Sequence, residues 1–210
     1  MFPALYAILD PTLIKDPLVE FAAQLSEAGV ELMQLRDKRA SARKIYAESR
    51  ALAERFAGSG VRLILNDRPD IAAMIGAGGV HVGQEDLPVE AARAICGSGC
   101  WVGVSTHNLA QLREANQTSA DYIAVGPIFP TATKENPDPV VGLDFLRFAR
   151  EETRKPLVAI GGITIQSAAD VFRAGADSVA VVRDLLEAPS PSGRAREYLA
   201  IADRSRSGRA

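Results

Sequence analysis

Short apolar runs alternate with longer amphipathic segments along the 210 residues of the chain. Runs of four or five mostly apolar residues predict buried strands, and apolar positions at helical spacing between them predict helices. The predicted strands span residues 5–9, 31–35, 62–65, 79–82, 101–104, 122–125, 157–160 and 178–181. The predicted helices span residues 16–28, 41–57, 69–75, 88–95, 109–118, 143–152, 166–173 and 193–204.

Four junctions between a predicted helix and the following strand share one pattern of small residues, namely "EAGVELMQL", "GAGGVHV", "TSADYIAV" and "RAGADSVAV". Such a recurring unit indicates a repeated βα architecture with parallel strands and right-handed crossovers. Eight units predict an α/β fold, a single (β/α)8 TIM barrel with parallel strands. An open doubly wound sheet is the alternative, but the strand count and the lack of a G-x-G-x-x-G motif after the first strand disfavour it.

The chain carries no internal linker, since no stretch rich in Pro, Gly or Ser divides it. We therefore expect one domain, a catalytic (β/α)8 barrel over residues 1–204. The last residues, 205–210, are polar and Gly-containing, and they are expected to form a frayed C-terminal tail.

Composition and charge exclude several classes of protein. With 47% hydrophobic and 24% charged residues, the chain has the composition of an ordinary globular protein. Its net charge of −2 provides no field for non-specific binding to nucleic acid or to membranes. No segment has the length of an apolar transmembrane helix, and the first residues indicate a strand rather than a signal peptide. Cys96 and Cys100 are expected to be free thiols, so we predict a cytoplasmic protein.

Polar side chains follow the carboxyl ends of most of the predicted strands, whereas the turns at the opposite ends are mostly Ala and Gly. In a parallel barrel the active site lies at the carboxyl ends of the strands, so this asymmetry predicts an enzyme. The candidate side chains at these ends are Gln34, Arg36, Lys38, Asn66, Asp67, His81, Asp86, Ser105, His107, Thr131, Thr133 and Lys134.

The charges in this set indicate a phosphorylated substrate. Arg36, Lys38 and Lys134 are three cations expected at one mouth, where they would neutralise phosphate oxygens. Asp67 and Asp86 are carboxylates at the ends of adjacent strands. Because Mg²⁺ prefers a few carboxylates together with waters and phosphate oxygens, the combination predicts a magnesium-bound polyphosphate.

A second phosphate site is expected after the seventh strand, at Gly161 and Gly162. A Gly-Gly turn before a helix presents backbone N–H groups, and phosphate sites are frequent at this position in barrels. The same dipeptide is also an ordinary tight turn, so the binding role depends on the other phosphate signals.

Several of these residues also allow a purely structural interpretation. Asp67 and Asp86 lie two residues before Pro69 and Pro88, which are expected at the first helical positions, so each aspartate could instead help to start a helix. For either residue alone the two interpretations have equal weight, but their place at neighbouring strand ends favours a shared function. His81, between two valines, is expected to be a buried, hydrogen-bonded histidine.

Three further polar residues need an explanation of their own. Gln34 and Asn66 place amide groups in apolar strands, which costs free energy unless each amide has a hydrogen-bond partner. His107 has a structural interpretation as a cap of the helix that begins near Asn108.

Six motifs occur in order along nearly the whole chain, each at a strand end: "QLRDK" (34–38), "LNDRPDIA" (65–72), "GVHVGQEDLP" (79–88), "GVSTH" (103–107), "DYIAVGPIFPTATK" (121–134) and "VAIGGI" (158–163). In this combination the sequence resembles the thiamine phosphate synthases. The resemblance implies a Mg²⁺-dependent transferase that joins 4-amino-5-hydroxymethyl-2-methylpyrimidine pyrophosphate to hydroxyethylthiazole phosphate, after dissociative loss of pyrophosphate. It implies these two small molecules as partners, neither nucleic acid nor membrane, and at most a second copy of the chain in a homodimer.

The resemblance also implies a role for each matching residue. Asp67 and Asp86 are implied to be the magnesium ligands. The implied catalytic residues are Arg36, Lys38, Ser105 and Lys134. The implied substrate-binding residues are Gln34, Arg36, Lys38, Asn66 and Lys134 for the pyrophosphate, Ser105 beside the pyrimidine, and Thr131, Thr133 and Gly162 for the thiazole phosphate.

The sequence departs from the family pattern after the eighth strand, where Val182 is followed by Arg183 instead of a small hydroxyl residue. An arginine can bind phosphate or point into solvent, so this contact stays open. Two other functions also stay open. A thiazole tautomerase on a similar barrel would transfer protons with a histidine such as His107, and a non-catalytic thiazole phosphate-binding regulator would lack the metal carboxylates. The intact pyrophosphate motifs favour the synthase.

Overall fold

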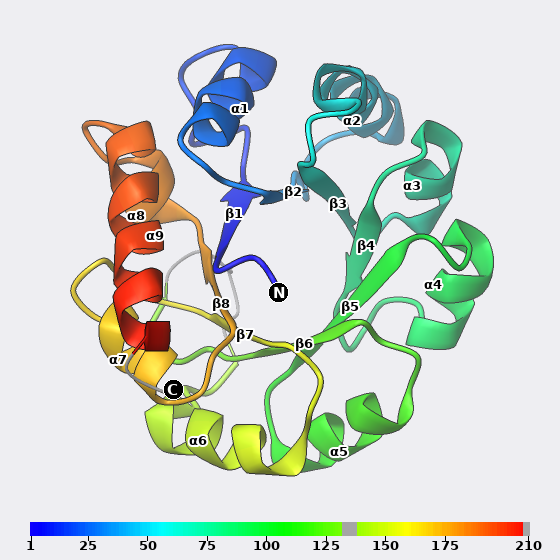
Figure 1. Cartoon of the computed structure of the whole chain (residues 1–210). Helices are drawn as coiled ribbons and strands as arrows, with labels where there is room; N and C mark the ends of the chain where they lie inside the picture. The colour runs from blue at the N-terminus through cyan, green and yellow to red at the C-terminus, as the bar shows by residue number, and fades with distance from the viewer. Residues whose placement is uncertain (132–137, 208–210) are drawn as a thin grey trace.

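Eight parallel strands close into a barrel, which Figure 1 shows in a view along its axis. The structure, a computed structural model, describes residues 1–131 and 138–207. The strands are β1 (Leu5–Leu9), β2 (Leu32–Leu35), β3 (Arg62–Asn66), β4 (Gly79–Val82), β5 (Trp101–Thr106), β6 (Tyr122–Val125), β7 (Leu157–Ile160) and β8 (Ser178–Val181). Each strand pairs with the next in the chain, and β8 pairs with β1. The predicted (β/α)8 barrel is therefore confirmed.

A ring of helices covers the outside of the barrel (Figure 1). In the described part of the chain these are α1 (Leu18–Glu27), α2 (Ala42–Phe56), α3 (Pro69–Ile75), α4 (Val89–Cys96), α5 (Leu109–Gln117), α6 (Gly142–Glu152), α7 (Ala168–Arg173), α8 (Arg183–Leu186) and α9 (Pro191–Ser207). Helix α8 was not predicted, because its four residues are too few to show helical periodicity.

The last helix is longer than the sequence predicts. Helix α9 spans Pro191–Ser207, whereas the prediction was residues 193–204. It thus includes residues 205–207 of the predicted tail, and residues 208–210 lie outside the described residues. The division into a catalytic domain and a tail stays a prediction.

Side chains of the strands alternate between the barrel interior and the surrounding helices. In β1, Tyr6 and Ile8 belong to the interior cluster, whereas Leu5, Ala7 and Leu9 pack against the helices. The interior cluster consists of Tyr6, Ile8, Leu32, Ile64, Tyr122, Ala124, Val158 and Ala180. Because both faces are buried, the strands are nearly continuous apolar runs, which is why they were easy to predict.

Aromatic rings fill part of the interior. The ring of Phe2 stacks on Trp101 with centroids 5.3 Å apart, and it lies 5.4 Å from the ring of Tyr122. Tyr122 also meets Tyr6 edge to face at 5.9 Å. Gly103 makes room for this packing, because a Cβ atom at that position would lie 2.0 Å from the Tyr122 ring.

Cys96 and Cys100 are both free thiols, as expected. Burial and the neighbouring Cys96 raise the pKa of Cys100 to about 12, so the neutral thiol is its normal form.

None of the helices in residues 1–131 and 138–207 is long and apolar enough to cross a membrane.

Candidate active site

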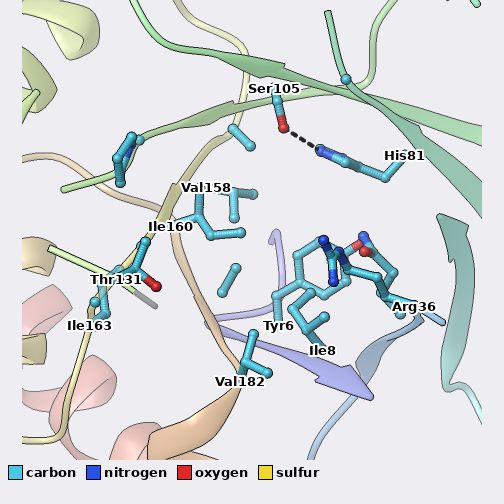
Figure 2. A pocket seen from close by; sticks show the side chains of 18 of the residues that line it. Tyr6, Ile8, Arg36, His81, Ser105, Thr131, Val158, Ile160, Ile163 and Val182 are labelled. Atoms are coloured by element: carbon cyan, nitrogen blue, oxygen red, sulfur yellow. Dashed lines mark hydrogen bonds between the residues drawn. The ribbon is translucent and has the colours of Figure 1, made fainter. Parts of the chain in front are cut away.

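A cavity of about 340 Å³ lies at the carboxyl ends of the strands, where the sequence predicts an active site. The residues that line the cavity come from all eight strands and from the loops that follow the strands. Figure 2 shows apolar side chains around this cavity together with polar ones: Tyr6, Ile8, Arg36, His81, Ser105, Thr131, Val158, Ile160, Ile163 and Val182. A largely apolar chamber with a few convergent polar groups is typical of a site for a small organic molecule.

Two carboxylates lie at the rim of the cavity. Asp67 directly follows β3, and Asp86 lies in the loop after β4. Oδ2 of Asp67 accepts a hydrogen bond from Asn66 Nδ2 at 2.6 Å and lies 2.9 Å from Lys38 Nζ. Oδ2 of Asp86 accepts a hydrogen bond from the backbone N–H of Gly83 at 2.8 Å. The structure thus gathers at one rim the charged residues that the sequence places on three separate strand ends.

Asp67 combines backbone strain with an unfavourable place for a charge. Its φ of 58° is the one positive φ that a non-Gly residue has in the described ranges, and this left-handed region is disfavoured for L-residues. Burial raises the pKa of Asp67 above its usual value, the nearby Asp86 carboxyl raises it further, and Lys38 opposes both. Strain and a perturbed carboxylate at one residue indicate a functional site.

The acidic pair fits a magnesium ion that is completed by a substrate. A divalent cation would relieve the repulsion between Asp67 and Asp86, and Mg²⁺ fills its remaining positions with water and phosphate oxygens. In the described residues, no three His, Cys, Asp or Glu side chains come together to hold a metal ion. Such a site is unlike the three- and four-ligand protein sites that are typical of zinc.

The loop after β2 brings Arg36 and Lys38 to the cavity, which both residues line. Asp37 organises this loop, since its carboxylate accepts hydrogen bonds from the backbone N–H groups of Arg39 and Ala40 and from Lys44 Nζ. Burial opposes ionisation of Asp37, but these hydrogen bonds hold its pKa below the usual value. This role of Asp37 is not among the sequence predictions, although an Asp that bonds backbone N–H groups two and three residues ahead is a common turn signal.

The floor of the cavity is a chain of hydrogen-bonded side chains from five strands. Gln34 Nε2 donates to Tyr6 Oη at 2.6 Å, and Tyr6 Oη lies 3.0 Å from Tyr122 Oη. Tyr122 Oη lies 3.0 Å from His81 Nδ1. His81 Nε2 lies 2.9 Å from Ser105 Oγ, the contact drawn as a dashed line in Figure 2.

These hydrogen bonds explain two polar residues that the sequence places in apolar strands. The buried amide of Gln34 has its partner, Tyr6, and His81 is a buried, hydrogen-bonded histidine as expected. His81 lines the cavity as well, and so does His107. Tyr6 and Tyr122 are not among the residues that the sequence predicts for the site, because a tyrosine within an apolar strand has the pattern of a core residue.

Gly161 and Gly162 form a turn of bare backbone on another part of the cavity wall. Both have a positive φ, 97° and 63°. A Cβ atom at Gly162 would lie 2.4 Å from the carbonyl oxygen of Pro130, so only glycine fits there without displacement. Within residues 1–131 and 138–207, no acceptor is bonded to the backbone N–H groups of Gly162 and Ile163. These two N–H groups are therefore available to an anion, as the sequence predicts for a phosphate site.

The segment after β8 supports this turn from behind. Asp184 Oδ2 accepts hydrogen bonds from the backbone N–H of Ile165 at 3.2 Å and from Arg194 Nη1 at 2.6 Å. It also accepts one from Tyr198 Oη at 2.7 Å. Arg183 is exposed, lines the cavity and pairs with Glu187 at 2.7 Å. Asp184 was not predicted, because its partners on α9 and after β7 become visible only in the folded chain.

The capping interpretation of His107 is wrong. Asn108 is the N-cap residue of α5, and its side chain accepts a hydrogen bond from the backbone N–H of Gln111 at 3.0 Å. Nδ1 of His107 instead lies 2.6 Å from the carbonyl oxygen of Gly126, and its Nε2 lies 3.4 Å from the Asp138 carboxylate.

Neither Asp67 nor Asp86 caps a helix. The N-cap residues of α3 and α4 are Arg68 and Pro88, and neither of them makes a side-chain capping hydrogen bond. Pro69 occupies the first position of α3 as expected, but Pro88 precedes the first residue of α4. The structural interpretation of the two aspartates as helix starters is thus not supported.

The remaining candidates lie in the segment after β6. Thr131 lines the cavity. Thr133 and Lys134 lie outside the described residues, so their roles depend on the sequence alone.

Comparison with known proteins shows the family of the chain. The family model described as thiamine monophosphate synthase matches residues 5–185. A thiamine-phosphate synthase from Koribacter versatilis is 51% identical over 204 residues, which cover 95% of each chain. One from Chloroflexus aurantiacus is 45% identical over 173 residues, covering 82% of this chain and 80% of the relative.

Solved structures agree with this result. A thiamine phosphate pyrophosphorylase from Pyrococcus furiosus superposes with a TM-score of 0.87 at 32% identity, and 96% of each chain is covered. A 3-hexulose-6-phosphate synthase from Salmonella typhimurium gives a TM-score of 0.71 at 19% identity and covers 96% of this chain and 99% of that one. The second likeness shows a shared barrel fold alone.

Proposed function

We infer how the cavity works from one premise: the chain belongs to the thiamine monophosphate synthase family. The chain is a transferase that condenses 4-amino-5-hydroxymethyl-2-methylpyrimidine pyrophosphate with hydroxyethylthiazole phosphate, giving thiamine phosphate and pyrophosphate. The metal ion, the residue roles and the order of bond changes are our proposal. The observation that carries it is the pair of carboxylates, Asp67 and Asp86, beside Lys38 at the rim of an apolar cavity.

The acidic pair is proposed to hold Mg²⁺, with the pyrophosphate of the substrate as a further ligand. When bound, the ion neutralises charge on the leaving pyrophosphate. The chain's own contribution is to hold two carboxylates close together against their repulsion, which the strained backbone of Asp67 and the Gly83 N–H on Asp86 support.

The cations of the mouth are proposed to bind the remaining pyrophosphate oxygens. Arg36 and Lys38 line the cavity from the loop after β2, and Asn66 adds an amide donor next to Asp67. Lys134 is proposed to act there too, close to the bond that breaks, from a segment outside the described residues. Preorganised donors of this kind stabilise charge as it develops on a leaving group.

The reaction proposed for this site is dissociative. The bond between the pyrimidine methylene carbon and the pyrophosphate oxygen breaks, the electron pair leaves with pyrophosphate, and the 4-amino group stabilises the cation. The thiazole nitrogen then attacks the same carbon, so no nucleophilic side chain is needed. Ser105 is proposed to lie beside the pyrimidine, and the apolar walls, including Ile8, Val158 and Ile160, exclude water that would capture the cation.

The thiazole phosphate is proposed to bind at the Gly161-Gly162 turn. The backbone N–H groups of Gly162 and Ile163 suit phosphate oxygens, and Thr131 lies on the same cavity. Thr133 is included in this proposal on its sequence position alone. Holding the second substrate here aligns its nitrogen with the pyrimidine carbon, so the attack becomes effectively unimolecular within the bound complex.

Neither rival function has comparable support. The relatives carry the name of the synthase, and the chain keeps both carboxylates, which a non-catalytic regulator would lack. A tautomerase transfers protons and binds no pyrophosphate, so its reaction does not require Asp67, Asp86 and Lys38 at one rim.

We further propose that the protein acts in the cytoplasm, where free thiols such as Cys96 and Cys100 persist. Any stable assembly is proposed to be a homodimer. Light scattering during gel filtration tests this directly, since a single species of the monomer mass of 22.4 kDa would contradict a dimer.

The deciding experiment mixes the purified protein with both substrates and Mg²⁺ and follows thiamine phosphate by chromatography. We expect product with Mg²⁺ and none with excess chelator. Undiminished turnover in the chelator would remove the metal from the proposal. Catalysed proton exchange on a thiazole carboxylate, without thiamine phosphate, would favour the tautomerase.

A further inference from the structure

In the row of hydrogen bonds beneath the cavity, it matters which group donates and which accepts at each contact. It links five side chains from five strands, Gln34, Tyr6, Tyr122, His81 and Ser105, through contacts of 2.6 to 3.0 Å. Tyr6 and Tyr122 are almost completely buried, at 1% and 0% exposure, so their hydroxyl groups have only each other and the neighbouring side chains as partners.

The first bond decides the direction of all the others. Gln34 donates its amide hydrogen to Tyr6, so the Tyr6 hydroxyl keeps its own proton for Tyr122. In the pattern that leaves no buried hydroxyl proton without an acceptor, Tyr122 donates to His81 Nδ1, which is then unprotonated. The proton of the neutral imidazole is then on Nε2, where it is donated to Ser105 Oγ.

The opposite direction does not satisfy the chain. If His81 donated from Nδ1, Tyr122 would donate to Tyr6, and Tyr6 would accept from both Tyr122 and Gln34. The Tyr6 proton would then have no acceptor among the described residues, which is costly for a buried hydroxyl. Burial also raises the pKa of Tyr6 and of Tyr122, so both hydroxyls keep their protons and remain donors.

We propose that Tyr122 and His81 are positioning residues that fix the Ser105 hydroxyl as a hydrogen-bond donor toward the cavity. Since Ser105 Oγ accepts from His81, its own proton points into the space that Ser105 lines. The inference rests on the proposed function, in which the pyrimidine lies beside Ser105, and it adds which hydrogen-bonding pattern the site selects.

The selected pattern is that of an aminopyrimidine. Its ring nitrogens carry lone pairs and accept a hydrogen bond, whereas the corresponding 4-oxo pyrimidine carries an N–H on the ring next to its carbonyl. The Ser105 hydroxyl, which accepts from His81, has its proton left to donate to a lone pair of the first ring. A ring N–H of the second compound at the same place would meet that proton and could bond only to the one remaining lone pair of Oγ. The inference therefore assigns discrimination between amino and oxo pyrimidines to residues that need not touch the substrate.

The test is a ratio of affinities. Isothermal calorimetry in Mg²⁺ buffer gives the Kd of the 4-amino pyrimidine pyrophosphate and of its 4-oxo analogue. We expect the unaltered protein to favour the amino compound by roughly a hundredfold, the effect of one buried polar group that loses its hydrogen-bond partner. Tyr122→Phe keeps the ring but removes the hydroxyl that fixes the tautomer of His81. The His81 proton can then move to Nδ1, so that Ser105 donates to Nε2 and accepts a hydrogen bond from the substrate. The ratio of the two affinities should therefore fall about tenfold.

A double-mutant cycle separates positioning from simple packing. If Tyr122 acts through Ser105, adding Tyr122→Phe to Ser105→Ala should change the ratio by less than about twofold. Tyr46→Phe on α2 is the matched control, because it makes the same chemical change outside the cavity lining, and its ratio should equal that of the unaltered protein. Thermal melts check that each variant is folded. Should Tyr122→Phe fail to fold, His81→Leu, which removes both the nitrogen that faces Tyr122 and the one that faces Ser105, replaces it in the same cycle.

The outcomes distinguish this inference from the proposed function. An equal loss of affinity for both pyrimidines in Tyr122→Phe, or additive losses in the cycle, would overturn the positioning role. Absence of thiamine phosphate synthesis by the unaltered protein would instead overturn the proposed function. The binding ratio tests the positioning role even then, because it needs no turnover.

Discussion

Two regions of the cavity are proposed to bind phosphate groups in different ways. At the rim after β3 and β4, charged side chains do the binding, and the partly buried Asp67, whose backbone is strained, lies beside Asp86. At the turn after β7, Gly161 and Gly162 offer the backbone alone. A mutation that removes a charged side chain should therefore impair binding at the rim. At the turn, a mutation that adds a side-chain atom should impair it.

The two regions should also differ in what they contribute to stability. A carboxylate held near a second one, in the left-handed region, works against folding. Gly162 adopts a similar φ without strain, so the turn is relaxed as it stands. Mutations at the rim are expected to separate activity from stability, and mutations at the turn to lower both.

The largest expected effect is on turnover, in Asp86→Ala. With one carboxylate of the pair gone, we expect kcat to fall by at least about 10²-fold, a typical loss when charge stabilisation at a leaving group is removed. The thermal midpoint should change little. Stopped assays of pyrophosphate release at several Mg²⁺ concentrations measure the effect.

A matched control for this change is Asp70→Ala, which removes a nearby carboxylate that is paired with Arg68 and lies outside the cavity lining. Its kcat should stay within about twofold of the unaltered protein, as for most surface changes. Full turnover by Asp86→Ala would exclude Asp86 from the metal site.

The second effect is on substrate affinity and stability together, in Gly162→Ala. The new Cβ atom would lie 2.4 Å from the Pro130 carbonyl oxygen in a residue with φ of 63°. We expect KM for the thiazole phosphate to rise about tenfold, and the free energy of unfolding to fall by about 1–3 kcal/mol. The KM for the pyrimidine pyrophosphate should change much less.

Gly76→Ala isolates the backbone contribution. Gly76 has nearly the same φ, 64°, but a Cβ atom there would meet nothing within 4 Å. This variant should lose about 1 kcal/mol of stability and keep both KM values. Equal KM values in both variants would mean that the turn after β7 binds no substrate phosphate.

The third effect has the opposite sign. Asp67→Gly removes the strain of the left-handed backbone and a buried carboxylate, so the free energy of unfolding should rise by about 1 kcal/mol while activity is lost. The partly exposed ion pair with Lys38 offsets little of this gain. Urea titration of the protein without Mg²⁺ measures it, and a clear loss of stability would contradict the contrast between rim and turn.

The smallest effect is expected at Arg183, the departure from the family pattern. Its guanidinium is half exposed and already paired with Glu187. Arg183→Ala should therefore change the KM for the thiazole phosphate by less than about threefold, close to the effect of Arg50→Ala, which breaks a similar exposed pair on α2. A tenfold increase confined to Arg183→Ala would show that this arginine replaces the expected hydroxyl contact.

The strands and the sites that follow them were predictable for one reason. Strands buried on both faces are apolar throughout, so Tyr122–Val125 and Ser178–Val181 were predicted with their observed bounds. A parallel barrel then places every carboxyl end on one side, which is why Asp67 and Asp86 could be expected as neighbours.

Other features had no local signal. Helix α8 is a single turn, and Asp184 binds Ile165, Arg194 and Tyr198, which are far from it along the chain or on another element. The cap of α5 was assigned one residue too early, because His107 and Asn108 are both polar and only the geometry selects the one that reaches Gln111.

The sequence by itself determined the barrel, the end of it that carries the chemistry, and the charges gathered there. These follow from periodicity and from the polarity of residues near one another in the chain. Only the tertiary structure decided the strain at Asp67, the close contact behind Gly162, and the row of hydrogen bonds that connects Gln34 to Ser105. The physical reason is that hydrogen bonds and steric contacts depend on which atoms face each other across strands, and residue order alone does not contain that information.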